Sequence, residues 1–384
     1  MVTAPFLPSA IEALRRDERF MRAALAMGRR GLGNTWPNPA VGCVIVRRVG
    51  DADVVVGRGW TQPGGRPHAE TQALAEAGPL AKGATAYVTL EPCSHYGRTG
   101  PCADALARAG VGRVVGALRD PDPRVGGRGF DMLRRYGLEV TEGVLADEAF
   151  QAHIGHITRV TFGRPAVTAK IAVSSDGKLA GPGGRQVKIT GPDASARVHL
   201  MRAQSDAIAV GIGTVLADDP MLNVRLPGMA AQSPLRIVFD SNLRIPLTSK
   251  LVRTARETPL WVIARADAPV EPEGALVAAG VEVMRIGCAA VPATAAPSLD
   301  LGEALRLLGT RGITRLMVEA GPHLAAALIE QDLIEEFVQF SSPEPIGEGV
   351  MALTPELLAK IDAQLPNLAA RMAGHDTMIV QRRS

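Results

Sequence analysis

The spacing of apolar residues predicts alternating helices and strands in the N-terminal part of the chain. Residues 17–30 carry apolar side chains at helical spacing, and residues 41–47 and 86–90 are short apolar runs typical of buried strands. Helical spacing over residues 102–109 is followed by another apolar run at 111–118. This alternation predicts a layered α/β/α domain at the N-terminal end.

The pattern starts again near residue 160, where a longer series of apolar runs begins. The chain's 384 residues exceed one ordinary hydrophobic core, so we predict two domains, residues 1–160 and residues 161–384. In the second domain the strand-like runs are 166–173, 206–211, 236–240, 260–264, 281–286, 316–319, 333–340 and 377–381, and the helical segments are 192–203 and 324–330. Both domains are therefore expected to be of the α/β class.

Composition narrows the classes of function. Hydrophobic residues make up 46% of the chain and aromatic residues 4%, and the net charge of +3 is spread over interspersed acidic and basic residues. We expect no nucleic-acid partner and no membrane partner, because there is neither a basic patch nor an apolar run of roughly twenty residues. Four cysteines are too few for a disulfide framework, which favours a cytoplasmic protein. The N-terminal residues lack the pattern of a signal peptide.

Three potential zinc ligands and one carboxylic acid lie between residues 68 and 102. His68 and Glu70 belong to the sequence His-Ala-Glu, and Cys93 and Cys102 each follow a proline. One histidine and two thiolates leave a fourth zinc position for water, as in zinc deaminases. Zinc lowers the pKa of such a water, and Glu70, which is not a ligand, can carry its proton to departing ammonia. We expect His68 and Glu70 in the N-terminal turn of one helix, facing the same pocket.

A structural zinc site is the alternative interpretation of these residues. It would need four protein ligands, and Cys43 in the apolar run 41–46 could supply the fourth. The His-x-Glu pair and the proline–cysteine sequences favour an open catalytic site. Eight residues separate Cys93 from Cys102, where the common deaminase signature has two. These intervening residues, 94–101, are polar and glycine-rich, so they suit substrate contact better than core packing.

Two glycine turns in the second domain each follow a predicted strand, at residues 211–214 and residues 321–323. Backbone N–H groups at such turns approach phosphate closely, so a nucleotide site is one interpretation and an ordinary turn is the other. Neither turn has the complete G-x-G-x-x-G sequence. Asp218 and Asp219 are either an acid pair or a solvated helix end.

Apart from its N-terminal segment, the chain resembles the bifunctional riboflavin-biosynthesis deaminase/reductase family. The Ser-His-x-Gly-x-Thr sequence between Cys93 and Cys102 is specific to that family. Matching residues in the second half are Arg202, Arg225 and the segments 175–178, 213–215, 218–220 and 319–322. The resemblance implies a cytidine-deaminase-like three-layer α/β/α domain followed by a dihydrofolate-reductase-like α/β domain.

The resemblance implies two successive reactions on one phosphorylated pyrimidine. The N-terminal domain would deaminate 2,5-diamino-6-(5-phosphoribosylamino)pyrimidin-4-one, and the C-terminal domain would use NADPH to reduce the ribosyl side chain to ribityl. Zinc would be held by His68, Cys93 and Cys102, with Glu70 as the proton carrier. The first substrate would contact Asn38, His95 and Arg98. NADPH would contact Ala172, Lys188, Thr214, Asp218 and Gly321, and the second substrate Arg202, Arg225 and Glu319.

Several positions depart from the pattern of that family. Lys188 stands where the family has a tryptophan against the cofactor, and Gln186 replaces a serine near the substrate. Gly100 replaces a proline before the last zinc ligand, and residues 341–345 replace an apolar segment. Lys188 could still serve NADPH by meeting a phosphate. A second interpretation is therefore a zinc deaminase active alone, with a decayed or nucleotide-sensing C-terminal domain.

Two further interpretations are less well supported by the sequence. A nucleoside, base or tRNA deaminase would have the shorter cysteine spacing, and a tRNA enzyme would also carry a basic, aromatic-laced surface run. A zinc-stabilised nucleotide sensor would use Cys43 to close the metal site. The resemblance also implies a homo-oligomer formed through the reductase domain. No single Arg or Lys identifies a site for the 2′-phosphate that distinguishes NADPH from NADH.

Overall fold

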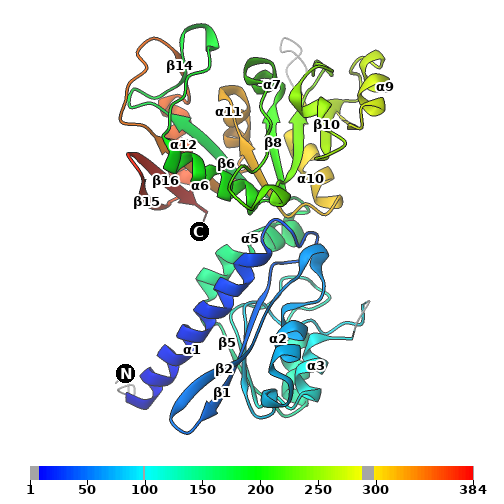
Figure 1. Ribbon diagram of the computed structural model, residues 1–384, viewed down its shortest axis with the longest axis vertical. Coiled ribbons are helices and arrows are strands. Elements are labelled where there is room, and N and C mark those ends of the chain that lie inside the picture. Colours follow the sequence, from blue (N-terminus) through cyan, green and yellow to red (C-terminus); the bar gives the residue numbers. More distant parts are fainter. Residues whose placement is uncertain (1–7, 98–99, 288–297, 384) are drawn as a thin grey trace. The chain divides into compact units, whose positions relative to one another are not determined.

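The computed structural model describes residues 8–97, 100–287 and 298–383 and divides the chain into two compact units (Figure 1). The units are Met1–Phe162 and Gly163–Ser384. Helix α5 (Ala146–Phe162) ends the first unit, in a region for which the apolar pattern predicts no helix. The boundary expected at residues 160 and 161 falls within the last turn of this helix.

The sheet of the N-terminal unit contains β1 (Gly42–Val49), β2 (Ala52–Trp60), β3 (Thr85–Val88), β4 (Arg113–Gly116) and β5 (Glu139–Glu142). Their spatial order within the described residues is β2-β1-β3-β4-β5. β1 is antiparallel to β2 and β3, whereas β3, β4 and β5 are parallel. The sequence analysis does not predict β2, because this strand lies at the edge of the sheet and many of its side chains are exposed.

Side chains of β1 alternate between two hydrophobic cores, one on each face of the sheet. Cys43 and Ile45 belong to one core, and Val44 and Val46 belong to the other. Successive side chains of a strand point to opposite faces, so a strand covered on both sides reads as a continuous apolar run. The first core includes residues of α2 (Ala69–Ala77), α3 (Cys102–Arg108) and α4 (Arg128–Arg135), and the second includes residues of α1 (Pro8–Gly28) and α5. This is the three-layer α/β/α arrangement that the sequence predicts.

The larger sheet of the C-terminal unit is mostly parallel. In spatial order, its strands within the described residues are β11 (Glu282–Ile286), β10 (Leu260–Arg265), β9 (Leu235–Phe239), β8 (Ala207–Gly211), β12 (Arg315–Glu319), β6 (Ala166–Val173), β13 (Glu336–Ser341), β16 (Asp376–Arg382) and β15 (Asn367–Ala373). The strands from β11 to β13 in this order are parallel. β16 is antiparallel to β13, and β15 is antiparallel to β16.

Helices cover this sheet, and those before the last one in the chain lie in the connections between its parallel strands. They are α6 (Pro192–Ala203), α7 (Ile212–Asp218), α8 (Lys250–Arg253), α9 (Glu271–Ala278), α10 (Leu301–Thr310), α11 (Pro322–Glu330) and α12 (Pro355–Gln364). Side chains of α7, α8 and α9 share one core with β8, β9 and β10, while α6 shares another with β12, β13 and β16. Parallel strands require such crossover connections, which place their carboxyl ends at the same edge of the sheet.

Smaller elements complete the two units. A separate two-stranded ribbon pairs β7 (Lys178–Ala180) with β14 (Val350–Met351). Single turns of 3-10 helix occur at Arg29–Gly31, Pro63–Gly65, Gly78–Ala81, Pro182–Gly184 and Ala230–Gln232. In the part of the chain that the structure describes, no helix combines the length and apolar character needed to cross a lipid bilayer.

Candidate active sites

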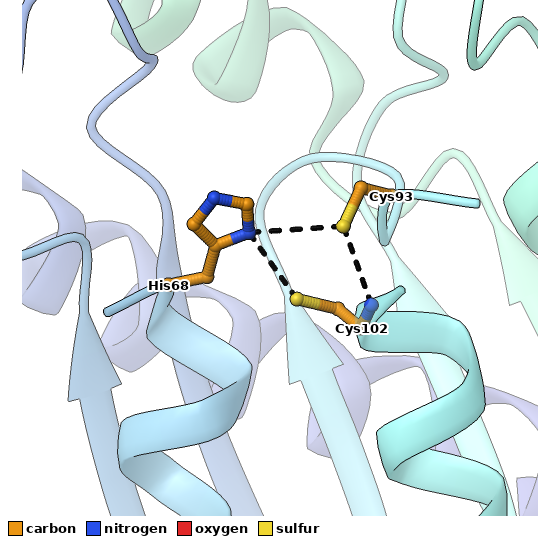
Figure 2. A group of neighbouring side chains, drawn as sticks. All are labelled: His68, Cys93 and Cys102. Carbon is orange, nitrogen blue, oxygen red and sulfur yellow. Dashed lines mark hydrogen bonds between the residues drawn. The ribbon is translucent and has the colours of Figure 1, made fainter. Parts of the chain in front are cut away.

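The three predicted zinc ligands converge from three different elements (Figure 2). His68 is the N-cap of α2, Cys93 lies in the loop after β3, and Cys102 is the first residue of α3. Their ligand atoms all lie within 4.8 Å of one another. Within the described residues, no other group of three or more His, Cys, Asp or Glu side chains could hold a metal ion.

The spacing of these atoms fits a zinc ion. His68 Nδ1 lies 3.3 Å from Cys102 Sγ and 3.7 Å from Cys93 Sγ. Zinc bonds of roughly 2.0–2.3 Å in tetrahedral geometry place two ligand atoms about 3.5–3.8 Å apart. Hydrogen bonds from Cys102 and His68 lower the pKa of the Cys93 thiol to about 4, whereas the interaction with Cys93 and burial raise the pKa of Cys102, so this pair favours one thiolate.

Glu70 lies beside this group, and Cys43 does not belong to it. Glu70 is in the first turn of α2 and is buried. Burial raises the pKa of Glu70 to about 7, and the charge of Cys93 adds to the rise. Cys43 is buried on β1, opposite Val88 of β3, and is not part of the candidate metal group. The described residues therefore offer three protein ligands and a nearby carboxyl group, as in an open catalytic site.

A pocket of about 240 Å³ adjoins the metal group and contains two of the three predicted substrate contacts. Asn38 and His95 line it together with His68, Glu70 and Cys93. Arg98, the third predicted contact, lies outside the described residues. Gly65 has a positive φ of 82°, and a Cβ atom there would lie only 1.9 Å from Asn38 Nδ2. This glycine is therefore required for the position of the Asn38 side chain.

The same pocket is also lined by charged residues that the sequence analysis does not single out. They are Arg66, Glu91, Asp120, Asp122, Arg124 and His156. For Asp120, Asp122 and Arg124 the sequence signal is the Arg-Asp-Pro-Asp-Pro-Arg run that begins shortly after β4, since polar residues at the carboxyl end of a parallel strand often face a ligand. His156 Nε2 lies 2.8 Å from Asp120 Oδ1, and both side chains are buried. Arg124 pairs with Asp122 at 2.5 Å and lowers the pKa of that carboxyl group to about 2.

Glu91 holds the loop that carries Asp120, Asp122 and Arg124 in place. Its Oε2 accepts hydrogen bonds from the backbone N–H groups of Asp120 and Gly127, at 3.2 and 2.9 Å. Its Oε1 accepts from Gly129 and Phe130, at 2.7 and 3.4 Å. One buried carboxylate therefore satisfies four backbone donors, of which Asp120 lines the pocket, and such charge-assisted bonds are strong.

A second cavity, of about 870 Å³, lies in the C-terminal unit. All eight residues predicted to contact NADPH or the second substrate line it: Ala172, Lys188, Thr214, Asp218, Gly321, Arg202, Arg225 and Glu319. The two glycine turns meet there, because β8 and β12 are neighbouring parallel strands. A Cβ atom on Gly321 would lie 3.8 Å from Thr214 Oγ1. This placement at the carboxyl ends of parallel strands is typical of ligand sites in α/β proteins.

A half-buried charge cluster lies in this cavity. Arg202 of α6 donates from Nε to Glu319 Oε1 at 2.7 Å, and Lys170 of β6 is the register partner of Glu319. Burial lowers the pKa of Lys170, although the charge of Glu319 opposes this shift. Burial alone would raise the pKa of Glu319, but Arg202 and Lys170 together lower it. The sequence analysis omits Lys170, although a single lysine within the apolar run 166–173 is a signal that could have identified it.

Three further cavity residues were also not predicted. His199 Nδ1 accepts a hydrogen bond from the backbone N–H of Arg225 at 3.4 Å. Burial and the charges of Arg202 and Arg225 lower the pKa of His199, which favours the neutral ring that this bond requires. Ser241 and Arg244 follow β9, the strand next to β8, and Arg244 is exposed.

Comparison with known proteins covers both units. The family model described as the cytidine and deoxycytidylate deaminase zinc-binding region matches residues 14–118, and the model of the RibD C-terminal domain matches residues 165–378. The riboflavin biosynthesis protein RibD of Escherichia coli is 41% identical over 350 residues, which cover 88% of this chain and 90% of that protein. The chain belongs to the RibD family.

Solved RibD structures agree with this assignment. Acinetobacter baumannii RibD has a TM-score of 0.80 and 35% identity, covering 97% of this chain and 100% of that chain. A deaminase/reductase from Thermotoga maritima, named for diaminohydroxyphosphoribosylaminopyrimidine and 5-amino-6-(5-phosphoribosylamino)uracil, has a TM-score of 0.80, 29% identity, and coverage of 97% of this chain and 100% of that one. The predicted family and the two predicted domain folds are thus confirmed.

Membership of the RibD family determines the general activity. The chain is a bifunctional enzyme of riboflavin biosynthesis, with a zinc-dependent deaminase domain and an NADPH-dependent reductase domain. It acts on a small-molecule substrate. A deaminase acting alone beside a decayed C-terminal domain is the less favoured interpretation, because the reductase family model matches almost the whole C-terminal unit.

Proposed function

We propose that the N-terminal unit deaminates 2,5-diamino-6-(5-phosphoribosylamino)pyrimidin-4-one and that the C-terminal unit reduces the resulting ribosylamino compound with NADPH. The observation that carries the deaminase assignment is the convergence of His68, Cys93 and Cys102 beside the buried Glu70. The substrates are those named for the Thermotoga relative. We assign the two activities to the units that end and begin at Phe162 and Gly163.

In the deaminase, the chain's residues would hold the metal and move protons. When bound by His68, Cys93 and Cys102, zinc supplies Lewis-acid activation of water near neutral pH. Glu70 takes a proton from the attacking water and delivers it to the amino group that leaves the pyrimidine as ammonia. The carbon thereby exchanges its amino group for oxygen, with one water consumed.

Neighbouring side chains would orient the pyrimidine and its phosphoribosyl group. Asn38 and His95 line the pocket beside Glu70, so their polar groups can hydrogen-bond the ring. We assign Arg98 to the phosphate, because guanidinium groups bind phosphate oxygens in a bidentate manner. Asp120 and Asp122 add acceptors for hydroxyl or amino donors on the same substrate.

In the reductase, the glycine turns would hold the cofactor. Thr214 and Asp218 lie on α7, and Gly321 is the N-cap of α11, so backbone N–H groups at the two turns would be available to a phosphate of the cofactor. Ala172 and Lys188 line the same cavity, and the positive charge of Lys188 suits a phosphate of NADPH. Arg202, Arg225 and Glu319 would hold the phosphorylated substrate in the remaining space.

The cluster of Lys170, Arg202 and Glu319 would supply the proton that the reduction requires. When bound, NADPH would supply hydride to C1′ of the ribosyl group; the C1′–O4′ bond breaks, and O4′ takes a proton to become the hydroxyl of the ribityl chain. Lys170 is a half-buried cation with a lowered pKa, so it gives up a proton more readily than an exposed lysine. We therefore assign Lys170 as the proton donor, with Glu319 and Arg202 fixing its position.

We also propose a homo-oligomer formed through the reductase unit and a cytoplasmic location. The oligomer rests on the family resemblance. The location rests on the chemistry of the zinc ligands, because two cysteine thiolates stay available to a metal in a reducing compartment.

A coupled assay tests the proposed function. Purified protein of known zinc content is given the diaminopyrimidine phosphate, and ammonia release and NADPH oxidation are followed separately. Both signals, with NADPH oxidation dependent on prior deamination, are expected. Ammonia without NADPH oxidation would contradict the reductase assignment, and absence of ammonia from zinc-loaded protein would contradict the deaminase substrate.

A further inference from the structure

The ribbon of β7 and β14 leads into a glycine-rich segment beside the reductase cavity. This segment, residues 181–190, has the sequence Gly-Pro-Gly-Gly-Arg-Gln-Val-Lys-Ile-Thr and is called the cover segment here. Gly184 and residues 186–190 line the cavity, as does Val350 of β14. The cover segment therefore forms part of the wall that NADPH would meet.

Hydrogen bonds to Asp176 fix the part of the chain that precedes the cover segment. Its Oδ1 accepts hydrogen bonds from Ser174 Oγ at 2.6 Å and from the backbone N–H of Ile346 at 3.0 Å. Its Oδ2 accepts from the backbone N–H of Gly347 at 2.8 Å. These bonds connect the turn before β7 to the segment before β14. Gly349 allows the close approach of the two strands, because a Cβ atom there would lie 2.2 Å from the Ala180 carbonyl oxygen.

A second carboxylate fastens the chain after the cover segment. Asp376, a buried residue at the start of β16, accepts a hydrogen bond from the backbone N–H of Gly191 at 2.7 Å. Gly191 is the N-cap of α6, the helix that carries Arg202. Both ends of the cover segment are thus held by buried or charge-assisted hydrogen bonds to the body of the C-terminal unit.

Between these two attachments, the cover segment makes few bonds. Its backbone hydrogen bonds are local ones, such as Gly181 N–H to the Arg185 carbonyl at 2.9 Å. Residues 186–190 make no hydrogen bond to any other described residue. Gly183 and Gly184 both have positive φ, and Cβ atoms there would meet nothing within 4 Å. A segment with firm ends, few internal bonds and adjacent glycines can move as a unit.

We infer that the cover segment is a lid that closes over NADPH in the reductase cavity, and that Asp176 and Asp376 are positioning residues that fix its ends. This inference rests on the proposed reductase function. Lys188 on the lid faces the cavity, and Arg185 gives the segment a second positive charge. Attraction between these cations and the phosphates of NADPH favours the closed position. The lid also excludes water from the site of hydride transfer.

Limited proteolysis tests closure directly, because trypsin cleaves after Arg185 and Lys188. The zinc-loaded full chain is digested with and without saturating NADPH, and the products are identified by mass spectrometry. Calorimetry on the same protein measures NADPH binding independently. We expect cleavage at these two positions in the free protein and at least a tenfold slower cleavage when NADPH is bound.

Variants of Asp176 test the attachment. In Asp176→Asn, Oδ1 still accepts from Ser174 and Ile346, but the amide nitrogen cannot accept from Gly347. We expect faster cleavage of the lid and a several-fold higher Kd for NADPH, with a larger effect in Asp176→Ala. Glu348→Gln is the matched control, because it removes one negative charge from the same exposed segment without a described hydrogen bond. The control should behave as wild type in both measurements.

The outcomes separate the lid from the proposed function. If wild-type protein binds NADPH but its lid is cleaved equally fast with and without it, the lid is overturned and the reductase assignment stands. If trypsin cleaves neither position in the free protein, the cover segment does not open, and the inference that it is a lid is again rejected. If NADPH does not bind at all, both the lid and the reductase assignment fail. If Asp176→Ala does not fold, Asp176→Asn with unchanged cleavage and Kd would overturn the role of Asp176.

Discussion

Arg202 Nε and Glu319 Oε1 lie 2.7 Å apart and join helix α6 to the carboxyl end of strand β12 inside the reductase cavity. The Arg202 and Glu319 side chains are only 11% and 19% exposed, so little water solvates their charges and each charge is stabilised by the other. Arg202 also donates from Nη1 to the Asn223 carbonyl oxygen at 2.9 Å, which fixes its guanidinium plane. If the proposed substrate assignment holds, this pair sets the position of the phosphorylated substrate relative to the glycine turns.

The first prediction concerns this pair. Glu319→Gln removes one charge and leaves Arg202 partly buried without its partner, which is strongly unfavourable. We expect the reductase kcat/KM to fall by at least roughly tenfold, which corresponds to about 1.4 kcal/mol of transition-state stabilisation. Ammonia release should not change, since the deaminase site lies in the other unit. Glu330→Gln, an exposed residue of α11, is the control. An unchanged reductase rate in Glu319→Gln would remove this residue from the site.

The second prediction separates chemistry from metal binding in the deaminase. Glu70→Gln cannot carry a proton, so ammonia release should fall by roughly 10²–10⁴-fold while one zinc ion per chain remains. Cys93→Ser should instead lose the metal, because it removes a ligand. Cys43→Ala serves as the thiol control, since Cys43 is buried in the core of the sheet and does not belong to the metal group. Zinc is measured by elemental analysis and ammonia by an enzymatic assay. Loss of zinc from Cys43→Ala would favour the closed four-ligand site.

The third prediction concerns the loop held by Glu91. Each Glu91 carboxylate oxygen accepts hydrogen bonds from two backbone N–H groups. In Glu91→Gln one of these oxygens becomes an amide NH₂ group, which cannot accept, so at least two backbone N–H groups lose their partner. We expect the deaminase KM to rise about tenfold or more, with zinc and reductase activity retained. Gly129→Ala disturbs the same loop from the other side, because its Cβ atom would lie 2.0 Å from the Pro92 carbonyl oxygen. It should reproduce the raised KM.

Glu12→Gln on the exposed face of α1 is the control for these two variants. A wild-type KM in both Glu91→Gln and Gly129→Ala would show that the loop does not touch the substrate. A fall in zinc content would instead indicate that Glu91 acts through the neighbouring ligand Cys93.

The sequence predicts those parts of the fold in which side chains are buried on both faces of a strand. Strand β6 and helix α6 coincide with the predicted ranges 166–173 and 192–203. Strand β2 and strand β15 are not predicted, because both lie at sheet edges and expose many side chains, so their apolar patterns are weak. Helix α5 is also not predicted: its buried positions include His153, Gly155, His156 and Thr158, which do not read as an apolar stripe.

The candidate sites show a similar division. The metal group was predictable because three ligands and Glu70 occur in a short, specific pattern. His199 and Arg244 were not, and Lys170 carried only the signal of a lysine within an apolar run, because the cavity forms only when β6, α6 and the turn after β9 meet. Position within a parallel sheet, rather than local sequence, brings such residues together.

The last prediction addresses the choice between NADPH and NADH. Arg244 is exposed, lines the reductase cavity and has no partner among the described residues, and it follows the strand next to the one that carries the first glycine turn. A guanidinium in this position suits the 2′-phosphate that only NADPH carries. Arg244→Ala should therefore raise the Kd of NADPH roughly tenfold and leave that of NADH unchanged.

Lys188 provides the internal comparison for this prediction. If Lys188 meets the pyrophosphate, which both cofactors share, Lys188→Ala should raise the Kd of NADPH and NADH by the same factor. An NADPH-specific effect would instead place Lys188 beside Arg244 at the 2′-phosphate. Arg253→Ala on the exposed side of α8 controls for the loss of one positive charge. An unchanged Kd and KM for NADPH in Lys188→Ala would show that Lys188 does not contact the cofactor. An equal effect of Arg244→Ala on the Kd of NADPH and of NADH would reject the assignment of Arg244 to the 2′-phosphate.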